Sequence, residues 1–147
     1  MINLGIYLPH LGDKELVYQC IQEINRGKDR GLISDASIFF DNIGTIDIPI
    51  SCGLFNSTDL WNFKGKLLIL SVECTIKTLN IINDIDMFFG YGWGNKNVFA
   101  TLSIISHKKI KTICRSKDLE EDFYRITGKN SVGSSENLEG VIELMTK

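Results

Sequence analysis

Short apolar segments alternate along this chain with segments of helical spacing. The clearest part lies between residues 66 and 117, where apolar runs at 67–70, 85–89 and 110–114 are separated by segments whose apolar residues recur at helical intervals. Buried strands that alternate with amphipathic helices are typical of a parallel sheet with helices on both faces. The pattern therefore predicts an α/β fold, a three-layer α/β/α Rossmann-like sandwich with a mainly parallel sheet of about five strands.

The predicted strands end in polar or glycine-containing corners. Pro9 is expected to stop the first strand. Residues 46–50 alternate between apolar and polar side chains as a strand does, but Pro49 restricts them to an edge strand or an extended loop. Val132 marks a very short additional strand. The main strands are expected at residues 4–8, 36–40, 67–70, 85–89 and 110–114.

Capping residues indicate where the intervening helices begin and end. Asp13 is a suitable N-cap for the first helix, and Gly27 is a suitable end. Ser116 is expected to cap a helix that ends at Gly128, and the acidic residues of its first turns suit the helix dipole. Further helices are expected over about residues 72–82, over 98–105 and after Ser134 or Ser135, with one helical turn at 60–63.

Composition narrows the class of protein. The 147 residues suffice for a single domain, which we assign to residues 1–147, and 44% hydrophobic with 23% charged residues is ordinary for a globular chain. The net charge of −2 gives no general attraction to nucleic acid or anionic membranes. No apolar run approaches the roughly 20 residues of a membrane span, and the first residues do not resemble a signal peptide. We therefore expect a cytoplasmic protein that binds neither nucleic acid nor membrane.

The cysteines do not form a metal-binding or redox motif. The 4 cysteines are too far apart for a C-x-x-C pair, and the chain has only 2 histidines, so we expect neither a metal nor another cofactor. Cys20, Cys74 and Cys114 lie among apolar residues and are expected to be small buried side chains. Cys52 lies in a predicted loop and is the one cysteine whose reactivity merits a test.

Polar residues that follow the strands are the candidate site residues, because parallel sheets bind ligands beyond the carboxyl ends of their strands. His10 follows the first strand and is a candidate general base or a ligand of a sugar hydroxyl. A surface or capping histidine is the alternative. Asp41 follows the second strand and is a candidate base or hydroxyl ligand, with a plain turn residue as the alternative.

The glycine-rich segment 90–94 follows the fourth strand and precedes a predicted helix. Glycines at such a position let backbone amides approach a phosphate, so Gly90 and Gly92 are candidate phosphate-binding residues. Asn95 stands where the dinucleotide fingerprint needs glycine, and the segment lacks the lysine of a P-loop. A flexible turn is the alternative. Trp93, between two glycines, is a candidate stacking surface for a sugar or base.

Arg115 and Ser116 follow the last main strand, at the start of a predicted helix. A guanidinium beside free backbone amides suits a phosphate or carboxylate. The alternative is a structural cap beside a solvated arginine. The basic residues at 107–111 have no interleaved aromatic side chains and are expected to form a solvated loop.

Two segments resemble a known class of enzymes. Residues 112–124, T-I-C-R-S-K-D-L-E-E-D-F-Y, resemble the last strand and helix of a glycosyltransferase Rossmann-like domain of the two-domain (GT-B) type. Residues 60–89 are similar to the matching region of small glycosyltransferase-like proteins of marine cyanophages, and the likeness covers roughly residues 60–145. It implies binding of a nucleotide sugar or glycan at the carboxyl edge of the sheet.

The chain departs from that class in several features. Two-domain glycosyltransferases hold the sugar nucleotide between two such domains, and this chain supplies one. Their late helix usually carries two glutamates eight positions apart, whereas Glu139 and Glu143 are four apart. Asp84-Ile85-Asp86 has the letters of a D-x-D motif but precedes a strand. Whether the chain is itself an enzyme is therefore left open.

A second hypothesis is a non-catalytic interaction module that pairs with itself or with another chain. The segment 46–63 is rich in apolar residues and poor in charges, so it is a candidate homodimer interface. Packing over the domain's own sheet edge explains the same residues equally well. A receiver-type signalling domain is a weaker third reading, because His10 and Ser71 stand where that fold needs acidic residues.

Overall fold

The computed structural model describes residues 2–11, 14–45, 49–80, 85–93 and 110–146. Within them the strands form one sheet in which every pairing is parallel, in the order β3-β2-β1-β4-β5-β6-β7. The strands are β1 (Ile2–His10), β2 (Ile33–Asn42), β3 (Gly53–Asn56), β4 (Gly65–Ile69), β5 (Ile85–Tyr91), β6 (Ile110–Cys114) and β7 (Gly133–Ser134).

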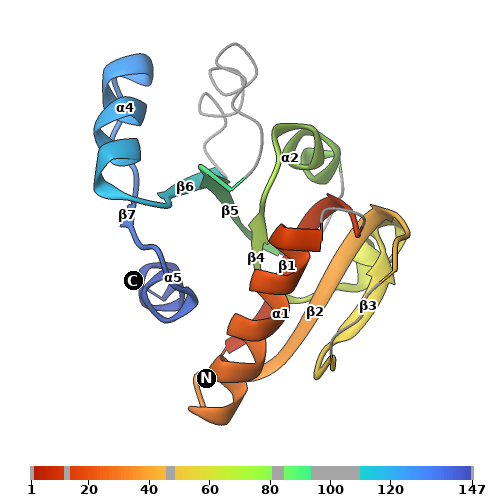
Figure 1. The fold of residues 1–147 in the computed structure, drawn as a ribbon. Helices are drawn as coiled ribbons and strands as arrows, with labels where there is room; N and C mark the ends of the chain where they lie inside the picture. Colours follow the sequence, from red (N-terminus) through yellow and green to blue (C-terminus); the bar gives the residue numbers. More distant parts are fainter. Residues whose placement is uncertain (1, 12–13, 46–48, 81–84, 94–109, 147) are drawn as a thin grey trace.

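Helices cover both faces of this sheet (Figure 1). One face carries α1 (Lys14–Asp29) and α5 (Leu138–Met145). The other carries α2 (Val72–Leu79), α4 (Lys117–Thr127) and the 3-10 helix η1 (Ser57–Asn62). The predicted α/β sandwich with a parallel sheet is thus confirmed, and the sheet has 7 strands where the pattern predicted about five.

The central strands are apolar on both sides because both sides are covered. In β1, Leu4, Ile6 and Leu8 belong to the core beneath α1 and α5, whereas Tyr7 points to the opposite core with Leu60 of η1 and Cys74 of α2. The continuous burial of Leu4–Leu8 follows from this arrangement. β7 has 2 residues and begins one residue after Val132, where a very short additional strand was predicted. β3 has 4 residues and was not predicted, since it is too short for a clear alternation in the sequence.

Several boundaries differ from the prediction, and packing explains the first two. β1 continues through Pro9 to His10. The ladder with β2 pairs Leu8 and His10 but not Pro9, so the N–H that proline lacks is not needed there. α1 continues through Gly27 to Asp29. A Cβ at Gly27 would lie 2.6 Å from Ile33 Cδ1, so this glycine lets the helix approach β2, and the turn is made by Gly31 at φ +71°.

The edge of the sheet also differs from the prediction. The edge strand is β3, which the pattern did not predict. Of the predicted edge strand or extended loop at 46–50, residues 46–48 lie outside the described residues, and residues 49–50 belong to no strand. The helical turn at 60–63 is confirmed as η1, which Asn56 caps by accepting a hydrogen bond from the Thr58 N–H at 3.1 Å. The predicted helix at 98–105 and the basic stretch at 107–109 also lie outside the described residues.

Of the caps predicted for the last two helices, the one of α4 is confirmed and the one of α5 is wrong. Ser116 caps α4 by accepting a hydrogen bond from the Leu119 N–H at 3.2 Å, and Gly128 ends it at φ 71°, as predicted. α5 is capped by Asn137 and not by Ser134 or Ser135. Ser134 belongs to β7, so the chain needs further residues to leave the sheet before a helix can begin.

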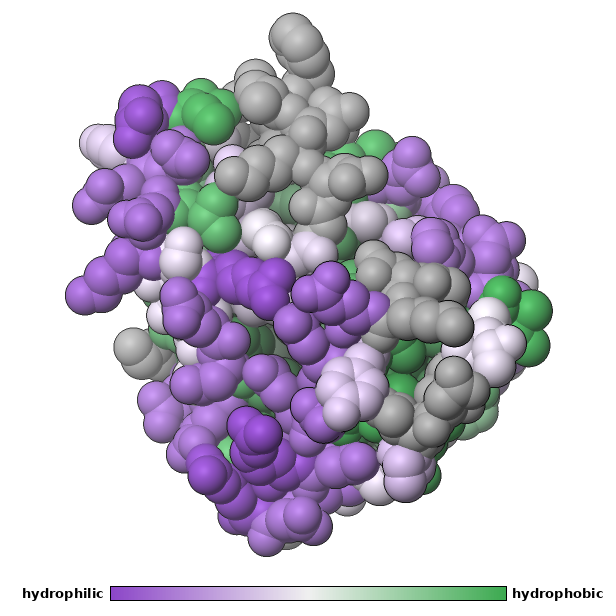
Figure 2. Space-filling model, viewed as in Figure 1, coloured by the Kyte–Doolittle hydropathy of each residue, from purple (hydrophilic) through white to green (hydrophobic). Residues whose placement is uncertain are grey.

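The structure also shows the surroundings of the cysteines and the character of the surface. Cys20, Cys74 and Cys114 are buried, as predicted, and Cys52 is half-buried just before β3. Among these residues, no helix has the length and apolar character of a membrane span, and no group of three potential metal ligands occurs. Hydrophilic side chains cover much of the surface in the lower part of Figure 2, over α1.

Candidate functional site

The strand order reverses beside β1. From β1 the chain builds β2 and β3 on one side and then returns to place β4 on the other side. In open parallel sheets, ligands bind in the crevice outside the carboxyl ends of the strands at this kind of reversal. The carboxyl ends of β1, β2, β4, β5 and β6 therefore define the region in which to look for a site.

One group of polar side chains gathers around Asp41 near the end of β2. The hydroxyls of Tyr7 (β1) and Ser57 (η1) donate to Asp41 Oδ1 at 2.7 and 2.6 Å. The Lys77 ammonium (α2) lies 3.0 Å from Asp41 Oδ2, and the Cys74 thiol lies 3.9 Å from the same oxygen. We call these five residues the Asp41 cluster. It joins four elements of the fold on the α2 face of the sheet.

Electrostatics fix the protonation of the Asp41 cluster. Burial alone raises the pKa of Asp41, but hydrogen bonds from Ser57, Tyr7 and Lys77 outweigh it and hold the pKa below its ordinary value. Burial and the hydrogen bond to Asp41 raise the pKa of Tyr7, and burial raises the pKa of Cys74 to about 11. The hydrogen bond to Asp41 raises the pKa of Lys77. At neutral pH the cluster therefore holds one carboxylate, one ammonium and a neutral phenol and thiol.

Local capping brings Lys77 and Ser57 to Asp41. Ser71 follows β4 and caps α2 by accepting a hydrogen bond from the Cys74 N–H at 3.0 Å, which starts the helix at the carboxyl edge of the sheet. Asn56 does the same for η1, whose first residue is Ser57. Two short polar residues at the ends of strands thus determine where the hydroxyl and the ammonium lie.

A second group lies on the α1 face and is centred on Arg115, directly after β6. The guanidinium Nη2 donates to Gln19 Oε1 of α1 at 3.0 Å, and the guanidinium carbon lies 5.9 Å from the ring centroid of Trp93. Gln19, Trp93 and Arg115 are each half-buried, and we call them the Arg115 cluster. The small cavity that they help to line holds about 30 Å³, enough for a water and not for a larger ligand.

The candidate glycines have a structural explanation in the same place. Gly90 lies inside β5 and not in a corner after it. A Cβ there would lie 2.9 Å from the Trp93 ring and 3.0 Å from Leu70 Cδ2. Gly92 has φ +106°, and a Cβ would lie 2.4 Å from Leu119 Cδ1. Both glycines therefore make room for neighbouring side chains, and Gly90 lets the indole of Trp93 lie against the sheet.

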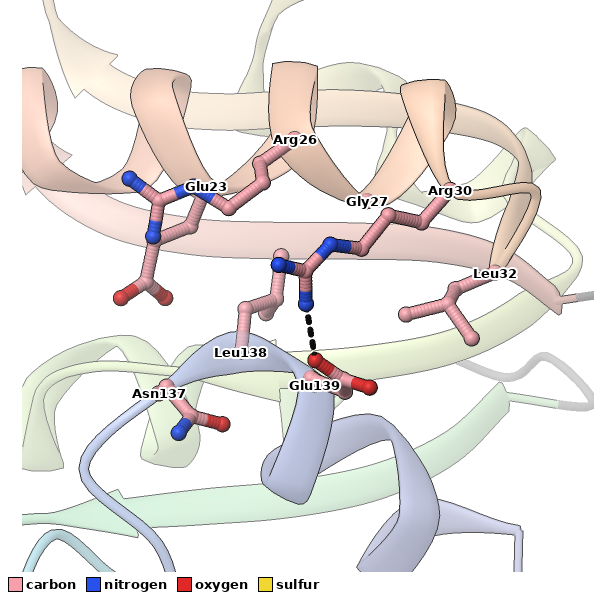
Figure 3. A pocket seen from close by; sticks show the side chains of 8 residues that line it. All are labelled: Glu23, Arg26, Gly27, Arg30, Leu32, Asn137, Leu138 and Glu139. Carbon is pink, nitrogen blue, oxygen red and sulfur yellow. Dashed lines mark hydrogen bonds and ion pairs between the residues drawn. The ribbon is translucent and has the colours of Figure 1, made fainter.

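The cavity between α1 and α5 holds charged residues that already serve the fold (Figure 3). Its volume is about 200 Å³. Glu23 of α1 accepts a hydrogen bond from the Leu138 N–H at the start of α5, and Arg30 of α1 forms an ion pair with Glu139 of α5. Burial raises the pKa of Glu23 despite the nearby arginines 26 and 115. These contacts dock α5 on α1, so we do not place the site here.

The two predicted catalytic residues are not brought together. His10 ends β1, exposed, and its backbone pairs with Asn42. Strand alternation places His10 on the face of Leu8, beneath α1, whereas Asp41 shares the opposite face with Tyr7. His10 therefore belongs to the side of the Arg115 cluster. Ser116 is occupied as the N-cap of α4, which fits the alternative of a structural cap.

Sequence reasoning missed the partners of Asp41 and the partner of Arg115. Tyr7 carried a signal, because a polar tip in an otherwise aliphatic buried strand usually finds a hydrogen-bond partner. No comparable pattern in the sequence pointed to Ser57, Cys74, Lys77 or Gln19. Their roles depend on how η1, α1 and α2 pack on the sheet.

Cys52 does not have the surroundings of a reactive cysteine. Its side chain is half-buried, and burial raises the pKa of its thiol although Lys28 works in the opposite direction. The reactive form of a cysteine is the thiolate, which needs a lowered pKa to be present at neutral pH. Because the pKa of Cys52 is raised, its thiolate is scarce at neutral pH. This favours the structural interpretation for Cys52.

Comparison with known proteins adds no relative: no protein-family model, curated protein or solved structure matches this chain.

Proposed function

We propose that this protein is a glycosyltransferase-like domain that binds a nucleotide sugar or glycan at the carboxyl edge of its sheet. The observation that carries the proposal is the reversal of strand order at β1, with the Asp41 cluster on one side of that edge and the Arg115 cluster on the other. A nucleotide sugar has an anionic diphosphate and a hydroxyl-rich sugar. Arg115 offers a cation for the diphosphate, and the exposed His10 at the end of β1 lies on the same face of the sheet.

Arg115 is the proposed phosphate ligand. It lies directly before α4, a helix of 11 residues whose N-terminal amides favour anions. Asp118 and Glu120 in the first turn offset part of the positive end of the helix dipole, and Arg115 also interacts with the charge of Glu23 on α1. A bound phosphate would therefore depend on the guanidinium for its positive charge and would compete with Glu23 for it. Gln19 and Trp93 hold the guanidinium in place, as its hydrogen bond and ring contact show.

On this proposal, Trp93, Gly90 and Gly92 act as supports. The indole is half-buried, with Arg115 over its ring and the sheet behind it. Gly90 and Gly92 leave room for the indole and for Leu119. His10 is the candidate hydroxyl ligand that lies on this face, where it ends β1 in an exposed position.

Thermal unfolding against a panel of uridine and guanosine diphosphate sugars tests the proposal. A ligand at ten times its Kd adds about 1.4 kcal/mol of stability, which raises Tm by about 3–5 °C for a chain of this length. Arg115→Gln should remove the shift, and Arg125→Gln should keep it, because Arg125 is an exposed arginine of α4 paired with Asp122. No shift at millimolar ligand would leave the proposal without support.

A specific observation favours a second candidate, the interaction module. Leu60 and Phe63 of the apolar segment are buried in the protein's own core, but Phe55 and Trp61 are 42% and 64% exposed. Ile43 and Ile50, near the same edge of the sheet, are 83% and 38% exposed. Green atoms at the right of Figure 2 lie over this edge, next to β2 and β3. Sedimentation separates the candidates, since a strict monomer at high concentration argues against self-association.

A further inference from the structure

We propose that Glu23 of α1 competes with the phosphates of the ligand for Arg115, so that an anion binds at Arg115 together with the uptake of a proton by Glu23. The inference rests on the proposed function, because it concerns the regulation of the same phosphate ligand. Binding is then stronger in mildly acidic than in alkaline solution. Glu23 limits the affinity without touching the ligand.

Glu23 connects Arg115 with the start of α5. It lines both the small cavity of about 30 Å³ beside Arg115 and the cavity of about 200 Å³ between α1 and α5, and Leu138 also lines both. The carboxylate of Glu23 accepts a hydrogen bond from the Leu138 N–H and interacts with the charge of Arg115. Gln19, one turn earlier on α1, accepts the hydrogen bond of 3.0 Å from the guanidinium. The same face of α1 thus holds Arg115 and carries the carboxylate that acts on it.

The charge of Arg115 is balanced before a ligand arrives. Glu136, in the segment between β7 and α5, lines the same small cavity as Glu23 and Arg115. One guanidinium therefore shares this cavity with two glutamates, and a diphosphate would bring further negative charge to it. Like charges repel one another more strongly beside a protein than in bulk water. Protonation of one glutamate would relieve much of that repulsion.

Glu23 is the glutamate that takes up the proton. Burial raises its pKa, although the Leu138 N–H, Arg26 and Arg115 act in the opposite direction. Glu136, by contrast, is exposed. A phosphate that occupies Arg115 weakens one of the influences that lower the pKa of Glu23 and adds a negative charge, so this pKa rises further. By linkage, a ligand that favours the protonated carboxyl binds more tightly as the pH falls.

The other charged residues around Glu23 line the larger cavity. Arg30 and Glu139 form an ion pair with each other there and largely cancel. Arg26, three positions after Glu23 on α1, supplies a positive charge whether or not a ligand is bound. His10 lies on the same face of the sheet, and histidine changes charge near neutral pH. The test therefore has to separate Glu23 from His10.

The test compares Glu23→Gln with Glu143→Gln in the full chain. Glutamine keeps an oxygen acceptor for the Leu138 N–H but carries no negative charge. Glu143 is the matched control, because it is an exposed glutamate of α5 that lines neither cavity. Calorimetric titration with UDP-glucose and with GDP-mannose at pH 5 and pH 8 gives the affinities. Repeating it in buffers of different ionisation enthalpy gives the number of protons taken up, and the diphosphates of both ligands keep their charge over this range.

Removal of the competing charge should tighten binding, which damage to the site would not do. At pH 8, Glu23→Gln should bind the nucleotide sugars about threefold more tightly than the wild type does, a modest gain because Arg115 acts on Glu23 through its charge at a distance. The wild type should take up protons on binding and bind about threefold more weakly at pH 8 than at pH 5. Glu23→Gln should lose both effects, and Glu143→Gln should keep them.

A second measurement needs no ligand. Titration of the Glu23 carboxyl carbon by NMR, assigned from its absence in Glu23→Gln, should give a higher pKa in Arg115→Gln than in the wild type. Arg125→Gln should leave this pKa unchanged, because Arg125 is paired with Asp122 on α4. An equal pKa of Glu23 in Arg115→Gln and in the wild type would show that the two residues do not act on each other.

The outcomes separate this inference from the proposed function. If Glu23→Gln binds the nucleotide sugars no more tightly than the wild type at pH 8, Glu23 is not the competitor, while the proposed function stands. A pH dependence that persists in Glu23→Gln belongs to another group, such as His10, and has the same consequence. If the wild type binds neither nucleotide sugar at either pH, both proposals fail.

Discussion

Two partly buried carboxylates, one on each face of the sheet, have pKa values that are shifted in opposite directions. Asp41 lies on the α2 face and Glu23 on the α1 face. Burial raises the pKa of each, but the three hydrogen bonds to Asp41 reverse the effect, whereas one backbone hydrogen bond and two arginines do not reverse it for Glu23. At Asp41, hydrogen bonds from two hydroxyls and an ammonium thus outweigh desolvation, whereas the more deeply buried Glu23 keeps a raised pKa.

The Asp41 cluster and the Arg115 cluster also differ in how many elements of the fold they join. The Asp41 cluster ties β1, β2, η1 and α2 together through one carboxylate, so it affects stability as well as any ligand. Among the described residues, Arg115 is held by a side-chain hydrogen bond with Gln19, a ring contact with Trp93 and the charge of Glu23, so it joins fewer elements and can be changed with less damage to the fold. Substitutions on the two faces should therefore differ in size and in pH dependence.

The largest effect is expected for Asp41→Ala. This change leaves the hydroxyls of Tyr7 and Ser57 without their acceptor, and Tyr7 is fully buried, so the free energy of unfolding should fall by about 2–4 kcal/mol. Asp86→Ala, which breaks the more exposed pair with Lys66, should cost about 0.5 kcal/mol. Urea denaturation measures both. An equal loss of unfolding free energy in the two variants would show that the Asp41 cluster stabilises the fold no more than the exposed ion pair does.

The next effect is expected for Gly90→Ala on the other face. The new methyl group would lie within 3.0 Å of Trp93 and Leu70, and such overpacking costs about 1–3 kcal/mol. Trp61→Phe leaves Trp93 as the one remaining tryptophan, so its fluorescence in that background reports on the indole directly. We expect a shift to longer wavelength as the indole moves toward solvent. Unchanged emission would mean that Gly90 does not hold the ring in place.

A smaller effect concerns acid stability through Asp41. Because its pKa in the fold is below the ordinary value of about 3.9, ionised Asp41 contributes stability that is present above that value and is lost as pH falls through the folded pKa. Asp41→Asn removes this contribution. The difference in unfolding free energy between the wild type and this variant should be constant above about pH 5 and shrink below pH 4. A difference that stays constant down to pH 2 would contradict the lowered pKa.

The smallest effect is expected for Glu23→Gln, and its sign is opposite. Because the pKa of Glu23 is raised in the fold, the stability that it contributes is present below the ordinary value of about 4.3 and is lost as pH rises through the folded pKa. Glutamine keeps an acceptor for the Leu138 N–H without the charge. The variant should match the wild type at pH 4 and be slightly more stable at pH 8. Lower stability at pH 8 would show that the charge of Glu23 supports the docking of α5.

Much of the fold followed from local sequence. Apolar runs that face two covered sides must be continuous, so the runs at 67–70, 85–89 and 110–114 marked β4, β5 and β6 well. Ser116 and Gly128 delimit α4 through interactions with their own chain neighbours, and such local chemistry is visible in a sequence. The errors at Gly27 and at the cap of α5 arose where a distant element decides, Ile33 in one case and the exit from β7 in the other.

For the candidate site, the sequence by itself determined that polar residues follow the strands, and it indicated Asp41 and Arg115 among them. Only the tertiary structure decided that these two residues lie in separate clusters, since the alternation of a strand's faces and the packing of α1, α2 and η1 select their neighbours. Tyr7 reaches Asp41 across 34 positions, and Gln19 reaches Arg115 across 96. Contacts at such separations depend on how the strands are ordered in the sheet, and no local pattern of residues encodes that order.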